Sequence, residues 1–99
     1  MITEIVTFRI DPGLGRDEVL ARYEETMPAW QENPELVRKM YLYDEEAGQG
    51  GGVYLWNSID AAKRAHDAAW CDRAEATYGS RPQFAYFETP FIIEGRSAG

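Results

Sequence analysis

The sequence predicts an α+β fold in which a four-stranded antiparallel sheet carries two helices on one face. Three observations lead to this prediction. Four short runs alternate apolar and polar residues, as half-buried strands do. Two longer stretches place apolar residues on one helical face. A glycine-rich segment, residues 48–52, separates two of the strands, as a hairpin does.

The first strand and the first helix are predicted over residues 2–10 and 16–32. In the strand, Val6, Phe8 and Ile10 share one face. The Asp-Pro-Gly sequence that follows breaks it. Pro28 lies inside the apolar pattern of the helix, so we expect a kink or a break near Met27.

The remaining elements are two strands, a helix and a last strand. The hairpin joins residues 36–43 to a strand that ends near residue 57, and a second helix is predicted over residues 58–78. The last strand is predicted from Pro82 through residue 94, with Pro90 at an edge or a bulge. The order β-α-β-β-α-β is the ferredoxin-like arrangement.

The chain is expected to form one domain over residues 1–95, followed by a flexible tail, 96–99. The face of the sheet away from the helices still carries large side chains. A one-layer sheet cannot leave such a face in water, so the sequence predicts that a second subunit covers it, in a homodimer.

The glycine-rich segment does not have the context of a phosphate loop. A phosphate loop leads into a helix whose N-terminus faces the anion, whereas residues 48–52 lead into the strand-like run Val-Tyr-Leu-Trp. The acidic residues Asp44, Glu45 and Glu46 precede it and would repel phosphate. A turn is therefore the better interpretation, and these acids are read as a solvated edge rather than a cation site.

Composition excludes several classes of partner. The net charge of −7 over 99 residues disfavours nucleic acid and anionic membrane surfaces. No run is long enough to span a bilayer, and the N-terminus does not read as a signal peptide. The single cysteine, Cys71, allows no internal disulfide and is compatible with the cytoplasm, the expected location. Cys71 is also expected to lie off the buried face of the second predicted helix and, without a second histidine to activate it, to be a poor nucleophile.

The second predicted helix carries the best candidate site. The buried stripe predicted for this helix consists of Ile59, Ala62, Ala65, His66, Ala69, Trp70, Arg73 and Ala76. Within it, His66, Trp70 and Arg73 are spaced i, i+4 and i+7, so they share one face of an uninterrupted helix, among small alanines that leave space above the sheet. His66, the chain's one histidine, is the natural proton carrier at neutral pH. In a cavity it would deprotonate a phenol or enol, with Trp70 as an apolar wall and Arg73 holding an anionic oxygen.

A purely structural role is the alternative for each of these residues. A lone histidine on an apolar face is often a core residue, and Arg73 near the helix end is also suited to reach water. Asn57, at the end of the third strand, would orient substrate or assist the helix start. The aromatic candidates for substrate contact are equally good core or interface residues; they are Phe8, Tyr23, Trp30, Tyr41, Tyr54, Trp56 and Trp70.

Two segments, GGVYLWNSIDAAKRAH and YGSRPQFAYFETPFII, together with Trp70, resemble a known family. They are similar to small bacterial mono-oxygenases of the dimeric α+β barrel superfamily, near the antibiotic-biosynthesis mono-oxygenases. The resemblance covers most of the chain and is strongest over residues 51–93. It implies a homodimer with a pocket between sheet and helices in each subunit. It also implies oxidation of anthrone- or quinol-like phenols by O₂ without metal or flavin.

The same resemblance suggests roles for the candidate residues. His66 would be the base, Trp70 and Trp56 walls, and Arg73 or Asn57 the partners of an oxyanion. One branch of the superfamily degrades haem with a first-strand Asn and a helical His. Here the first strand offers Thr7 and Arg9 instead, which disfavours haem, and no cofactor is expected.

The sequence leaves three functions open. The first is a cofactor-free mono-oxygenase acting on a planar phenolic small molecule, which predicts an aromatic pocket containing His66. The second is an isomerase or cyclase that uses the same pocket for proton transfer alone. The third is a non-catalytic dimeric barrel that binds a hydrophobic small molecule or a partner, with His66 hydrogen-bonded inside the core and no cavity beside it.

Overall fold

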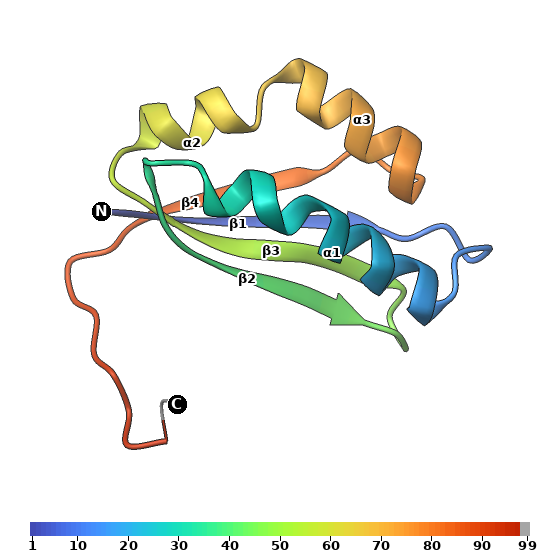
Figure 1. Ribbon diagram of the computed structural model, residues 1–99, viewed down its shortest axis with the longest axis horizontal. Coiled ribbons are helices and arrows are strands. Elements are labelled where there is room, and N and C mark those ends of the chain that lie inside the picture. Colours follow the sequence, from blue (N-terminus) through green and yellow to red (C-terminus); the bar gives the residue numbers. More distant parts are fainter. Residues whose placement is uncertain (98–99) are drawn as a thin grey trace.

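The computed structural model describes residues 1–97 and contains the predicted four-stranded sheet (Figure 1). Its strands are β1 (Ile2–Arg9), β2 (Leu36–Asp44), β3 (Gln49–Trp56) and β4 (Gln83–Glu88). They lie in the order β2-β3-β1-β4, and each neighbouring pair is antiparallel. This strand order is the ferredoxin-like one, so the α+β prediction is confirmed.

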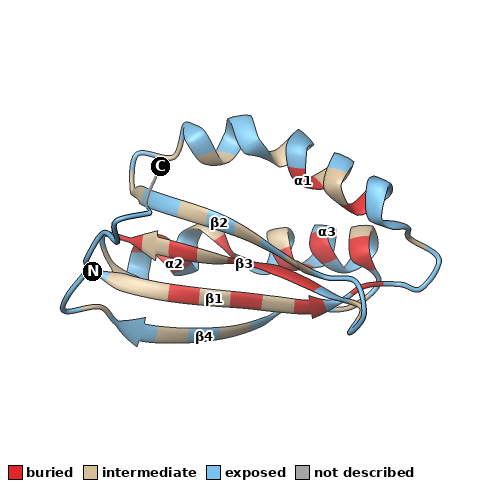
Figure 2. Cartoon of the chain, turned by 90° about the horizontal axis from the view of Figure 1, so that it is seen from below, coloured by how far each residue is buried: buried red, intermediate tan, exposed pale blue. Residues whose placement is uncertain are grey.

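The helices α1 (Arg16–Gln31), α2 (Ile59–Ala65) and α3 (Ala68–Tyr78) lie on one side of the sheet (Figure 1). Figure 2 shows that buried residues concentrate in the central strands β1 and β3 and in α3. Each central strand pairs on both sides, so alternate side chains of β1 and β3 are enclosed between sheet and helices. None of the helices within residues 1–97 has the length and apolarity to cross a bilayer.

Helix α1 continues past Pro28 to Gln31, so the predicted break near Met27 is wrong. Pro28 stands in the last turn of the helix and is exposed. A proline there removes one backbone bond from a helix end whose other groups already face solvent. The carbonyl of Pro28 still accepts the N–H of Glu32 at 3.2 Å.

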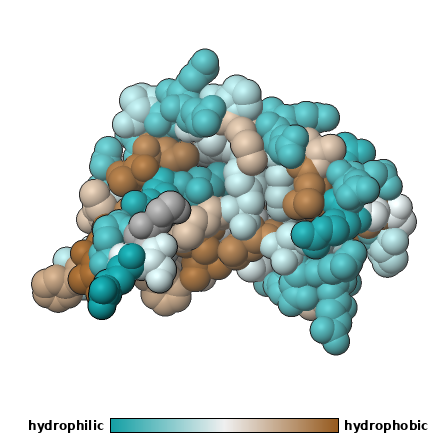
Figure 3. All heavy atoms as spheres, turned by 60° about the horizontal axis from the view of Figure 1, so that its bottom comes forward, coloured by the Kyte–Doolittle hydropathy of each residue, from teal (hydrophilic) through white to brown (hydrophobic). Residues whose placement is uncertain are grey.

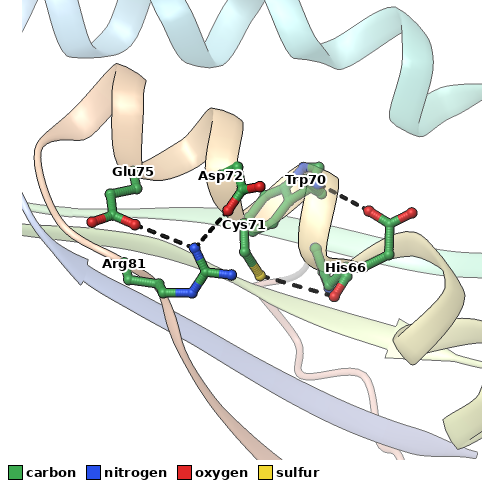
Figure 4. A network of polar contacts seen from close by, with 7 residues as sticks. His66, Trp70, Cys71, Asp72, Glu75 and Arg81 are labelled. Carbon is green, nitrogen blue, oxygen red and sulfur yellow. Dashed lines mark hydrogen bonds and ion pairs between the residues drawn. The ribbon is translucent and has the colours of Figure 1, made fainter.

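The predicted single helix over residues 58–78 is two helices, and the prediction is wrong at His66 and Asp67. Residue His66 leaves helical geometry with φ −104° and ψ 55°. Asp67 then caps α3, because its carboxylate accepts the N–H of Trp70 at 2.9 Å. Figure 4 shows this junction, where the Cys71 thiol also donates to the carbonyl of His66. The caps are local side-chain chemistry that a hydrophobic stripe does not report.

The break shifts the buried face of α3 relative to the predicted stripe. Cys71, Ala74 and Tyr78 are buried, whereas the predicted core positions Arg73 and Ala76 are exposed. Ile59 and Ala69, which also belong to the predicted stripe, are exposed as well. The expectation that Cys71 lies off the buried face is therefore wrong as well.

Strand β4 ends at Glu88, so the predicted strand through residue 94 is too long. The N–H of Thr89 donates to the carbonyl of Met1 at 2.9 Å, and residues 90–94 form no strand. Pro90 has no N–H with which to continue the ladder. Of the predicted tail, 96–99, the last two residues lie outside the described part of the chain.

Candidate functional site

Three consecutive glycines of β3 leave its backbone bare beneath helix α1. The turn is made by residues 45–48, with Gly48 at φ 65°, so the glycine-rich segment is mostly strand. A Cβ at Gly50 would lie 2.3 Å from the Tyr23 hydroxyl, and one at Gly51 would lie 1.8 Å from the carbonyl oxygen of Val6. A side chain at Gly51 would overlap the backbone of Val6, and one at Gly50 would displace Tyr23, which the hairpin interpretation did not foresee.

Tyr23 of α1 occupies the space that the glycines leave. Its hydroxyl donates to the carbonyl of Leu42 at 2.8 Å and accepts the N–H of Gly51 at 3.2 Å. Burial raises the pKa of this phenol, so Tyr23 remains neutral in the neutral pH range. The ring is thereby fixed between helix and sheet.

An open-mouthed cavity of about 260 Å³ lies beside Tyr23, between α1, α3 and the helix-covered face of the sheet. We call it the aromatic cavity. Its size is near the lower end of small-molecule pockets, about 300–1,000 Å³. Rings from three strands and two helices form the wall, and these are Phe8, Tyr23, Trp30, Tyr41, Tyr54, Trp70 and Tyr78.

Lys39 of β2 reaches into this ring of aromatic side chains. Its Nζ lies 3.9 Å from the ring centroid of Tyr41, 4.5 Å from that of Trp30 and 4.6 Å from that of Tyr54. Burial lowers the pKa of Lys39 to about 7, against a smaller upward effect from Glu4. Lys39 therefore changes charge in the neutral range, where lysine is ordinarily a fixed cation.

Behind the cavity, Glu4 and His66 form a contact that is closed to solvent. Glu4 Oε1 lies 2.8 Å from His66 Nδ1, and both side chains have 0% exposure. The contact is at ion-pair distance but lacks the alignment of a hydrogen bond, and His66 Nε2 has no partner among the described residues. The indole of Trp56 donates to the same carboxylate oxygen at 2.9 Å. Glu4 is thus held by two aromatic side chains.

His66 is packed among rings rather than open to the cavity. Its ring centroid lies 4.3 Å from that of Trp70 and 4.5 Å from that of Tyr54, and both of those residues line the cavity. His66 itself does not contribute to the lining. A base must reach within hydrogen-bond distance of its substrate. The predicted role of His66 as base needs such contact with the cavity, whereas the His66 ring contacts Glu4 behind the wall.

The structure brings most of the predicted site residues together. Arg73 and six of the aromatic candidates line the aromatic cavity, and these six are Phe8, Tyr23, Trp30, Tyr41, Tyr54 and Trp70. Three predicted residues lie elsewhere. His66 and Trp56 are in the core behind the wall, and Asn57 is exposed at the end of β3, outside the lining.

Sequence reasoning missed Glu4, Arg22 and Lys39. Glu4 shares the alternating face of Val6 and Phe8, so an acid on an apolar face was the available signal. Lys39 shares a face with Tyr41, and a lysine among aromatic residues on a covered face was a similar signal. Arg22 lies on α1 one residue before Tyr23, and no sequence pattern distinguishes it.

Comparison with known proteins shows which solved structures share this fold. No protein-family model matches the sequence, and no curated protein matches it. Among solved structures, SnoaB, a cofactor-independent oxygenase from Streptomyces nogalater, is 18% identical with a TM-score of 0.67. The match covers 95% of this chain and 97% of SnoaB. The chain has the fold of the antibiotic-biosynthesis mono-oxygenases.

Two further structures share this fold. The ActVA-Orf6 mono-oxygenase of Streptomyces coelicolor, in complex with nanaomycin D, is 16% identical, covers 95% of this chain and 91% of its own, and has a TM-score of 0.67. A mutant of MhuD, with two manganese protoporphyrin IX molecules per active site, is 17% identical. It covers 96% of this chain and 100% of its own, with a TM-score of 0.71. The resemblance expected from the sequence is confirmed at the level of the fold.

The described residues do not fit a porphyrin held through histidine. The one histidine of the chain, His66, has no exposed side-chain surface and lies against Glu4 rather than in the cavity lining. An iron ligand needs a free ring nitrogen directed at the metal. Within residues 1–97 there is also no cluster of three or more His, Cys, Asp or Glu side chains placed to hold a metal ion.

Proposed function

We propose that the protein is a cofactor-independent mono-oxygenase that acts on a planar phenolic or quinol-like small molecule in the aromatic cavity. The observation that carries the proposal is the wall itself. Aromatic rings from β1, β2, β3, α1 and α3 surround one space of about 260 Å³, which suits a flat apolar molecule. The chain shares its fold with a structure named as a cofactor-independent oxygenase, and this supports the proposed reaction class.

The proposed reaction needs only the substrate, O₂ and proton transfer. Deprotonation of an anthrone-like substrate gives a carbanion that reduces O₂. One oxygen atom becomes a ring carbonyl and the other leaves as water, so that R₂CH₂ and O₂ give R₂C=O and H₂O. The task of the protein is to exclude water, to hold the ring and to favour the deprotonated form.

The residues have different proposed roles. The six aromatic candidates in the lining, with Tyr78, hold the ring of the substrate. Arg73, at the cavity wall, pairs with an anionic oxygen. His66 and Trp56 are positioning residues. Glu4 holds both side chains, and their rings pack behind Tyr54 and Trp70. Asn57 lies outside the lining and is given no contact with substrate.

Oxygen uptake tests the function. Purified protein, without added metal or cofactor, is assayed with a panel of anthrones and hydroquinones. Catalase is then added, because it converts any hydrogen peroxide to water and O₂ and so reveals peroxide as a return of oxygen. We expect uptake of one O₂ per substrate with no peroxide. Proton exchange or isomerisation of the same substrates without uptake would favour the isomerase or cyclase. Binding without any turnover would favour the non-catalytic barrel.

We further propose a homodimer that covers the open face of the sheet. The strand register places Met40, Val53 and Ile5 in one row on this face, with Leu55 and Phe87 in the next row. Met40 is 51% exposed and Phe87 is 55% exposed. Figure 3 shows hydrophobic residues gathered on the face turned forward. An exposed apolar sheet face of this kind is typical of a subunit interface.

A further inference from the structure

Lys39 is a cavity residue that the function described above does not use. Besides its contacts with three aromatic rings, its side chain lies across the bare backbone of Gly52, where a Cβ would stand 3.2 Å from Lys39 Cε. No carboxylate of residues 1–97 lies within ion-pair distance of its Nζ. The amine is therefore held in place without a counterion of its own.

The cavity is positively charged in a chain that is otherwise acidic. The net charge of the chain is −7, yet the cavity lining holds Arg22, Lys39 and Arg73 against one acid, Glu25. The Nε of Arg22 is buried and has no hydrogen-bond partner among the described residues. Such a surplus of donors in an apolar space favours an anionic ligand group.

We propose that Lys39 is the group that takes the proton from the acidic hydroxyl of a phenolic or enolic ligand and then pairs with the resulting oxyanion. This inference rests on the proposed function, since it names the base and the counterion of the same cavity. In the step, the ligand O–H bond breaks and an N–H bond forms at Nζ. The product is an ammonium–phenolate pair, and no electrons leave the ligand.

The surroundings suit a lysine that alternates between amine and ammonium. Burial favours the amine, while the aromatic faces and Glu4 favour the ammonium. The result, a pKa of about 7, makes both forms accessible near neutral pH. The titratable or charged groups that face this region are Glu4 from β1, Arg22, Tyr23 and Glu25 from α1, Tyr41 from β2, Tyr54 from β3, and Arg73 and Tyr78 from α3.

The test uses 4-nitrophenol as a probe in the absence of oxygen, because its phenolate absorbs visible light and its neutral form does not. Wild-type protein is compared with Lys39→Met, which removes the amine and keeps the apolar stem. Lys63→Met is the matched control, since it changes the only other lysine, which is exposed on α2 with its Nζ 5.8 Å from the Tyr86 ring.

We expect wild type and Lys63→Met to hold the probe as phenolate below the pH at which the free probe ionises. The apparent pKa of the bound probe should be at least about one unit lower than in Lys39→Met, a tenfold change in the ionised fraction. Affinity in wild type should pass through a maximum with pH, because one proton is shared between amine and phenol. In Lys39→Arg, a fixed cation, affinity should only rise as the probe ionises.

Two results of the probe experiment would overturn the inference, and they can be told apart. Binding with the same probe ionisation in wild type and Lys39→Met would remove Lys39 from this role while the cavity keeps its phenol. No binding to wild type would remove the proposed function itself, and this inference with it. In protein labelled with ¹³C only in lysine, the Cε signal of Lys39, assigned by its loss in Lys39→Met, should titrate near pH 7. A Lys39 signal that titrates near the ordinary lysine value of 10.5 would also contradict the inference.

Discussion

Glu4 Oε1 and His66 Nδ1 lie 2.8 Å apart, on side chains that have no exposed surface. The contact joins the central strand β1 to the junction between α2 and α3. Removing one member of a buried ion pair leaves the other charge, or its polar atoms, without a partner in an apolar space. The pair therefore couples the helix break to the sheet.

The first prediction concerns this pair. We expect Glu4→Ala and His66→Ala each to lower the free energy of unfolding by about 3–5 kcal/mol. The double variant should cost clearly less than the sum, because each single change already removes the contact. Urea unfolding of the four proteins measures the coupling. Additive losses would show that Glu4 and His66 do not stabilise one another.

The second prediction concerns the glycines of β3. Gly51→Ala should be the most damaging, because its Cβ would lie 1.8 Å from the backbone oxygen of Val6. Gly50→Ala meets the Tyr23 hydroxyl at 2.3 Å, a side chain that can shift, and should cost about 1–3 kcal/mol. Gly95→Ala, with nothing within 4 Å, is the control. Thermal unfolding gives the order, and equal midpoints for all three variants would contradict it.

The third prediction is a pH dependence of stability. The pKa of Lys39 falls from 10.5 to about 7 on folding, so the unfolded chain binds more protons between these values. Stability from this group is therefore lowest below pH 7 and rises with pH above it. We expect Lys39→Met to be more stable than wild type at pH 6 and to lose about half of this advantage by pH 9, in urea unfolding. Lys63→Met, at the exposed lysine of α2, is the control variant. An advantage of Lys39→Met that stays constant with pH would contradict the lowered pKa.

The fourth prediction concerns the open face of the sheet. Met40 is 51% exposed and lies on the edge strand β2, within the proposed dimer interface. Met40→Glu would bury a charge between two apolar sheets, so we expect a dimer in wild type and a monomer in the variant. Light scattering after size exclusion measures the mass. Glu24→Gln, exposed on α1, is the control. A monomeric wild type at micromolar concentration would contradict the interface.

The order and type of the strands followed from alternation, because a period of two is a local property that tertiary contacts reinforced here. The break at His66 could not be predicted in this way. Alanine, arginine and lysine around it favour helix on either side, and the break depends on the cap by Asp67 and on the contact with Glu4, which is 62 positions away in sequence. The extent of β4 was overestimated for a similar reason, since no partner strand continues beyond Glu88.

The aromatic lining of the cavity was within reach of the sequence, because Phe8, Tyr41 and Tyr54 lie on the covered faces of predicted strands. The role of Gly50 and Gly51 was not, because glycine at a hairpin and glycine beneath a tyrosine have the same sequence pattern. Alternation puts Lys39 on the same strand face as Tyr41 but does not show that the helices cover this face, and no function for Lys39 was predicted. Its significance depends on three rings that come from different elements.

The most direct test of the account is the source of the oxygen atom in the product. It is measured in wild type and in a variant whose cavity is filled by a larger side chain. Ala74→Leu fills the lining from α3, and Ala76→Leu makes the same change on the exposed side of the same helix. With ¹⁸O₂ and an anthrone substrate, we expect one ¹⁸O atom per product from wild type and Ala76→Leu, and at least a tenfold slower reaction from folded Ala74→Leu (about 1.4 kcal/mol in the barrier). Label from water, or equal rates in all three proteins, would contradict oxygenation in this cavity.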